Sequence, residues 1–118
     1  MSLEYSANSN KGQPVLVVME GMCLLVNCKV TKSEGTGILS ALERLPKAGE
    51  PLPVVFMKNC SVSNCGKHPG VEVRAFGSAF LDNCNLYDNS QGYSSTHFAK
   101  NTVLRNCNIF NNKLEGVI

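Results

Sequence analysis

The side chains best suited to chemistry in this 118-residue chain are six cysteines, two histidines and a few acids. Cys65 and His68 stand three residues apart, and a thiol beside an imidazole could hold a metal ion or form a nucleophile–base pair. The spacing lacks the two short cysteine pairs of a zinc ribbon. His97 lies in a separate polar stretch. We therefore interpret all three residues as turn residues and expect no metal and no other cofactor.

The acidic residues offer no evident catalytic pair. Asp82 and Asp88 are the only aspartates, and we expect a separation of six residues to place them on different sides of one structural unit. Glu72 and Arg74 share one face of a predicted strand and could form a charged site, although a solvated ion pair is the simpler interpretation. The acids therefore argue weakly against an enzyme.

The elements that position these residues follow from an internal repeat. Four segments share the order apolar, apolar, variable, Asn, Cys, polar, aliphatic, variable, polar. They are LLVNCKVTK from Leu24, FMKNCSVSN from Phe56, FLDNCNLYD from Phe80 and VLRNCNIFN from Val103. The Asn-Cys pairs are 32, 24 and 23 residues apart. Self-similarity at such a period indicates a solenoid.

Each repeat unit has the periodicity of strands rather than helices. The cysteine and the aliphatic residue two positions later alternate with polar residues, which predicts a strand. The asparagine before the cysteine interrupts this alternation, and asparagine tolerates the left-handed backbone region, so we expect a one-residue bend there. A glycine-led aliphatic strand follows at Gly37, Gly70 and Gly116, with the weaker Gly92-Tyr93 in the third unit.

Stacked coils would place each residue over its equivalent in the next coil. We therefore predict an asparagine ladder of Asn27, Asn59, Asn83 and Asn106 and an inward cysteine file of Cys28, Cys60, Cys84 and Cys107. Stacked cysteines point the same way, which disfavours disulfides, and the file is interpreted as packing. Free thiols fit an intracellular, reducing location, cytoplasmic or nuclear. Lys58, Asp82 and Arg105 alternate in sign before the asparagines and should pair across strands.

Two segments depart from the repeat. Ile38, Ala41, Leu42 and Leu45 have helical spacing before Pro46, so we expect a helical turn from Ser40 to Leu45 inside a loop insertion. Residues 1–13 lack an apolar stretch and are interpreted as a disordered N-terminal segment or a cloning remnant. The repeat domain spans residues 14–118, and we expect it to be truncated at the C-terminus because KLEGVI ends within an apolar run.

The order aliphatic-x-Asn-small-x-aliphatic-x-x-Asn, followed by Gly-aliphatic, resembles the repeat of the pectin-lyase-like superfamily. LDNCNLYDN and LRNCNIFNN are the closest matches, and the resemblance covers about residues 14 to 118. It implies an all-β fold, a right-handed parallel β-helix of about four coils. The superfamily includes polysaccharide lyases, hydrolases and epimerases as well as proteins that use the helix as an interaction surface. The aspartate-containing motifs of its pectate lyases and polygalacturonases do not occur in this chain.

Two functions remain open. The first is a non-catalytic module that presents a lateral surface to a protein or glycan, through an aromatic patch of Tyr87, Phe110, Tyr93 and Phe98. The second is a fragment of a polysaccharide-active enzyme. Nucleic acid is not an expected partner because the 11 basic residues are scattered and the net charge is only +2. No apolar run is long enough for a membrane span. Open solenoid ends favour self-association.

Overall fold

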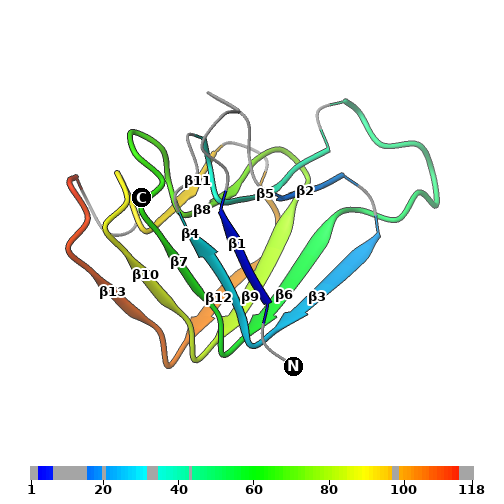
Figure 1. Cartoon of the computed structure of the whole chain (residues 1–118). Helices are drawn as coiled ribbons and strands as arrows, with labels where there is room; N and C mark the ends of the chain where they lie inside the picture. Colours follow the sequence, from blue (N-terminus) through cyan, green and yellow to red (C-terminus); the bar gives the residue numbers. More distant parts are fainter. Residues whose placement is uncertain are drawn as a thin grey trace.

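The chain folds into three parallel β-sheets that surround one core (Figure 1). The computed structural model describes residues 3–6, 16–19, 21–31, 35–42, 44–96 and 99–114. Within these ranges the regular structure consists of strands, and no helix occurs. Every strand pair is parallel, as a solenoid requires when the chain returns to the same sheet once per coil.

Each sheet takes one strand from each coil. Sheet A contains β1 (Leu3–Ser6), β4 (Cys28–Thr31), β7 (Ser61–Ser63), β10 (Asn85–Tyr87) and β13 (Asn108–Phe110). Sheet B contains β2 (Leu16–Val18), β5 (Ile38–Ser40), β8 (Val71–Val73) and β11 (Tyr93–Ser95). Sheet C contains β3 (Met22–Val26), β6 (Val54–Lys58), β9 (Ser78–Asp82) and β12 (Thr102–Arg105). The chain therefore visits B, C and A in turn, and four such coils follow β1.

The register places equivalent repeat positions beside one another. In sheet C, Leu24 pairs with Phe56, Phe56 with Phe80 and Phe80 with Val103. In sheet A, Val30, Val62, Leu86 and Ile109 form the same kind of row. The predicted all-β parallel β-helix of about four coils is therefore confirmed.

The corner between sheets C and A is a one-residue bend. The asparagine that joins the two strands has φ between 54° and 56° in every coil, at Asn27, Asn59, Asn83 and Asn106. Asparagine adopts this left-handed region at lower cost than other residues with a side chain, because its short amide can hydrogen-bond locally. The corner between sheets A and B also uses positive φ, at Asn64, Asp88 and Asn111. The bend at this second corner was not predicted from the sequence.

The core consists of inward rows that pack one coil on the next. Fully buried members come from all three sheets, including Val62, Leu86, Met57, Leu81 and Val71. Burial of one such side chain stabilises the fold by about 1.5–3 kcal/mol. Because every row repeats in each coil, the four coils share one continuous core.

The predicted helical turn from Ser40 to Leu45 is wrong for the residues that the structure describes there. Strand β5 continues to Ser40, and the amides of Ala41 and Leu42 donate to carbonyl oxygens of neighbouring coils, at Val18 and Ala75. An amide that pairs with a neighbouring coil cannot also pair within a helix. The helical spacing instead reflects the burial of Ala41 and Leu42 beside the sheet.

Leu3–Ser6 lie in the segment 1–13 that we expected to be either disordered or a cloning remnant, and they form a strand. These residues form β1, which pairs in parallel with β4 from Leu3↔Cys28 to Ser6↔Thr31. The exposed edge of β4 offers unpaired backbone groups, and β1 satisfies them. The other residues of this segment lie outside the described ranges.

Candidate functional site

The four repeated cysteines occupy the inside of the corner between sheets C and A. Cys60 donates its thiol to the carbonyl oxygens of Lys58 at 3.3 Å and Leu25 at 3.4 Å. Cys84 donates likewise to Asp82 at 3.5 Å and Met57 at 3.6 Å. The thiols of Cys60 and Cys84 thus contact their own coil and the preceding one. The cysteines therefore supply donors to corner carbonyls as well as apolar volume.

All six cysteines of the chain are free thiols. The hydrogen bond with Cys60 and the loss of water around the side chain raise the pKa of Cys84. Burial raises the pKa of Cys65 to about 12. Because the thiolate is the reactive form, neither residue is suited to nucleophilic chemistry at neutral pH.

Backbone hydrogen bonds connect the bend asparagines to the next coil. The amides of Asn27, Asn59 and Asn83 donate to Lys58, Asp82 and Arg105 of the following coil. Their side chains are exposed, and among the described residues no side-chain hydrogen bond joins one bend asparagine to the next. Buried asparagines with side-chain hydrogen bonds between coils lie at the other corner instead.

Asn89 and Asn112 form that second arrangement, at the corner between sheets A and B. The fully buried Asn89 accepts a hydrogen bond from the amide of Cys65 at 3.1 Å and donates to the carbonyl of Val62 at 3.1 Å. Asn112 repeats both contacts one coil later, to the amide of Asn89 and the carbonyl of Leu86. The last asparagine of LDNCNLYDN and of LRNCNIFNN was the sequence signal for these residues.

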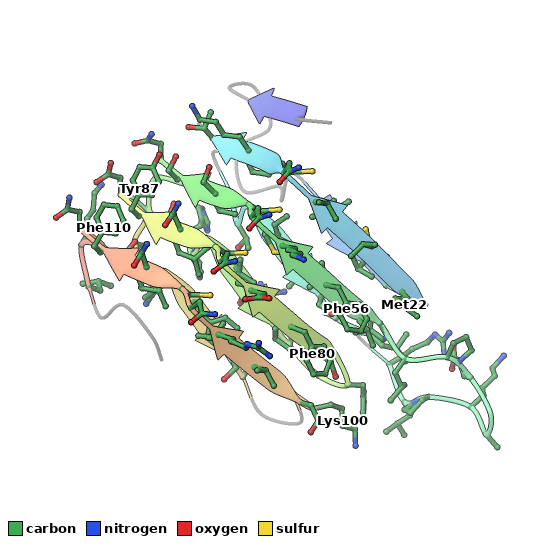
Figure 2. All side chains as sticks on the ribbon, turned by 90° about the horizontal axis from the view of Figure 1, so that it is seen from below. Met22, Phe56, Phe80, Tyr87, Lys100 and Phe110 are labelled. Atoms are coloured by element: carbon green, nitrogen blue, oxygen red, sulfur yellow. The ribbon has the colours of Figure 1, made fainter. Side chains whose placement is uncertain are left out.

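The aromatic residues predicted to form one surface patch do not all lie on the surface. Tyr87 and Phe110 stack on the outside of sheet A, with ring centroids 5.0 Å apart (Figure 2). Tyr93 is only 3% exposed, so its prediction as a surface residue is wrong. It pairs with Val71 and takes the same inward position, where its hydroxyl hydrogen-bonds with Thr102. Phe98 lies outside the described residues.

Glu72 and Arg74 form an ion pair in which Arg74 Nε lies 2.9 Å from Glu72 Oε2. Thr36 donates its hydroxyl to the other carboxylate oxygen, also at 2.9 Å. Glu72 is largely buried, and both of its oxygens accept a hydrogen bond. This arrangement stabilises the carboxylate in place and leaves it poorly available to a ligand.

The remaining chemical candidates stay apart. Cys65 is buried, whereas His68 lies in the following turn, with its backbone amide bonded to the Cys65 carbonyl. Asp82 ends a strand of sheet C, and Asp88 lies at the corner between sheets A and B. His97 lies outside the described residues. No group of three metal-ligating side chains occurs in the described part of the chain.

The outer face of sheet C carries an exposed apolar surface that was not predicted from the sequence. Its central row consists of Leu24, Phe56, Phe80 and Val103, one residue per coil. Leu24 is 66% exposed and Val103 is 47% exposed. Phe56 and Phe80 stack with centroids 5.0 Å apart, and Figure 2 shows their rings side by side. Met22, at the start of β3, extends the surface with 74% exposure.

A groove of about 320 Å³ runs over this face. The apolar row lines it together with a charged row of Lys58, Asp82 and Arg105, two residues further along each strand. The register places these charges beside one another as predicted, but they form no ion pair within the described structure, where the ion pairs are Arg44–Glu50 and Glu72–Arg74. The buried Oδ1 atom of Asp82 has no hydrogen-bond partner.

The signal for this surface was the double apolar position that opens each repeat. Side chains alternate across a strand, so two adjacent apolar residues cannot both face the core. In Phe56-Met57 and Phe80-Leu81 the second residue is buried and the first lies outside. A contiguous row of outward apolar residues differs from the singly scattered exposed residues that are normal on protein surfaces.

A protein-family model described as a right handed beta helix region matches residues 13–118. The comparisons with curated proteins and with solved structures gave no match. The described residues contain no helix long and apolar enough to cross a membrane.

Proposed function

Since the chain belongs to the right-handed β-helix family, we propose that it is a non-catalytic binding module whose binding surface is the outer face of sheet C. The observation that carries this proposal is the continuous row of Leu24, Phe56, Phe80 and Val103 beside the groove. Exposed apolar rows of this kind cost solubility unless a partner covers them. The fold supplies a rigid frame for such a surface.

The character of the groove favours a protein over a glycan as the partner. Apolar and aromatic side chains form its central row, and charged side chains border it. Protein interfaces combine an apolar, aromatic centre with a polar rim in the same way. The alternative surface for a glycan is the Tyr87–Phe110 stack on sheet A, where Asn108 also donates to Asn85 at 2.9 Å.

Selection from a displayed random-peptide library, run beside a glycan array, tests the proposal. We expect the chain to select apolar peptides and Leu24→Ser to lose at least tenfold in binding. The matched control is Phe110→Ser on sheet A, because Phe110 is 45% exposed and its loss should not affect the selected peptides. Ligands that are lost with Phe110→Ser but retained by Leu24→Ser would move the binding surface to sheet A.

The alternative is that the chain is part of a polysaccharide-active enzyme. A turnover assay tests this alternative. The chain is incubated with polygalacturonate, pectin and alginate, with and without calcium, and unsaturated products and reducing ends are measured. We expect no turnover. Turnover that Asp82→Asn or Arg74→Gln abolishes would replace the proposal with an enzymatic function.

We also propose that the chain acts in a reducing, intracellular compartment. Six free thiols, three of them buried, support this location because disulfides form and persist mainly in oxidising compartments.

A further inference from the structure

We propose that the partner of the sheet C face is a second copy of this chain, packed face to face about a two-fold axis that runs parallel to the strands between β6 and β9. This inference rests on the proposed function and names the partner of the same surface. It differs from end-to-end association of the coils, because the sheet edges take no part in the contact.

The symmetry determines which strands meet. A half-turn about an axis parallel to the strands keeps their direction and reverses their order. Strand β6 therefore faces the partner's β9, and β3 faces the partner's β12. Each outward row meets the same row of the other copy, in the aligned arrangement that packed sheets adopt at about 10 Å.

The apolar row is complementary to itself under this operation. Phe56 meets the partner's Phe80, and Leu24 meets the partner's Val103. Because the contact is isologous, each of these pairs occurs twice. The two most exposed residues of the row thereby leave water together with the stacked phenylalanines.

The charged row is also complementary to itself. Lys58 of one copy meets the partner's Asp82, and the symmetry repeats the pair. The ammonium group of Lys58 would pair with the accessible part of the Asp82 carboxylate, which forms no ion pair with the described residues of its own copy. Arg105 lies opposite the partner's Val26, which its aliphatic stem can cover.

The alternating charges of Lys58, Asp82 and Arg105 determine between which strands the two-fold axis runs. An axis through β9 would put Asp82 against the partner's Asp82, and an axis through β6 would oppose two Lys58 side chains. An axis between β9 and β12 would leave β3 with the exposed Met22 and Leu24 uncovered. Only the axis between β6 and β9 pairs opposite charges and covers all four strands.

The size of the face predicts a reversible dimer. Four strands at about 4.8 Å and five residues at about 3.3 Å give a projected area of roughly 300 Å². A stable interface buries about 800 Å² of accessible surface on each partner. Because the two faces together fall below this size, we expect a weak, transient dimer that forms only at high protein concentration.

Sedimentation velocity over a range of concentrations tests the inference with two single variants. Lys58→Asp opposes two acids across the interface, and Asp82→Lys opposes two lysines, so each should weaken dimerisation at least tenfold. In an equimolar mixture the first variant meets the second with opposite charges, and the dimer should return. The double variant K58D/D82K should dimerise like the original chain. Lys29→Asp, an equal change of charge on sheet A, should have no effect.

Three results would overturn the inference. They are a wild-type chain that stays monomeric at about 1 mM, single variants that dimerise normally, and a mixture of the two variants that stays monomeric. A dimer that the single variants leave intact would place association at the coil ends. A monomer that still selects peptides through Leu24 would reject the second copy and retain the proposed binding surface.

Discussion

The side-chain oxygen of Asn89 accepts a hydrogen bond from the backbone amide of Cys65, one coil earlier, at 3.1 Å. Asn89 is fully buried, and its side-chain nitrogen donates to Val62 in the same earlier coil. One side chain thus satisfies a donor and an acceptor at a corner where the strands have ended. The stacking of coils three and two depends on this contact as well as on the apolar core.

Replacing Asn89 with alanine should therefore be costly. The change leaves a buried amide and a buried carbonyl without partners, and we expect a loss of about 3 kcal/mol in the free energy of unfolding. Urea denaturation measures this loss. Asn108→Ala removes an exposed hydrogen bond to Asn85 and should cost less than about 1 kcal/mol. Equal losses in the two variants would show that Asn89 has no special role.

The bend between sheets C and A predicts a different response at Asn83, whose φ is 55°. Asn83→Val places a β-branched residue in the left-handed region and should cost about 1–2 kcal/mol. Asn83→Gly should be nearly neutral, because glycine adopts this conformation without steric cost. Midpoints of urea unfolding give both values. A valine variant as stable as the glycine variant would contradict the importance of the bend.

Gly37 should not accept a side chain. A Cβ atom there would lie 2.5 Å from Val62 Cγ1 and 2.6 Å from the carbonyl oxygen of Gly70, both within the stacked coils. We expect Gly37→Ala to lower the free energy of unfolding by about 2 kcal/mol, a typical cost of overpacking. Gly49→Ala is the control, because no atom lies within 4 Å of its Cβ and only its φ of 76° opposes the change. The prediction fails if the Gly37 variant unfolds at the same denaturant concentration as wild type.

The ion pair of Arg44 and Glu50 in the loop insertion should respond to pH. The Arg44 guanidinium, followed by the Lys47 amide, lowers the pKa of Glu50 from 4.5 to about 2. A lowered pKa stabilises the folded loop above pH 4.5, and this contribution is lost as the pH falls toward 2. Titration by NMR should show the low pKa in wild type and a return toward 4.5 in Arg44→Gln. Lys47→Gln should change it little, because Lys47 acts mainly through its backbone amide at 2.8 Å. A wild-type value near 4.5 would contradict the ion pair.

Repetition made the fold predictable. The bend at Asn83 and the inward direction of Leu86 occur at the same repeat position in every coil, so one stereochemical argument applied four times. Tyr93 was placed wrongly because it replaces a small aliphatic residue, although its alignment with Val71 after a glycine already indicated an inward direction. The prediction of a helical turn failed because the spacing of apolar residues indicates only which side chains are buried. The backbone hydrogen-bond partners of Ala41 and Leu42 lie in other coils.

The candidate site was harder to predict than the fold. Both residues of the pair Leu24-Leu25 are apolar, so their types do not indicate which of them faces outward. The structure adds the direction, and with it the alignment of the outward residues across four coils. The charges at Lys58 and Asp82 were correctly placed in register, but their side chains form no pair within one copy.

The most direct measurement of the central claim is the change in backbone amide NMR signals as the chain is concentrated. We expect signals of β3, β6, β9 and β12, including Leu24, Phe56 and Val103, to shift together while those on the outer faces of sheets A and B stay constant. The sheet C face would then be the surface on which the module binds. Shifts confined to the last coil, or to Tyr87 and Phe110 on sheet A, would contradict it.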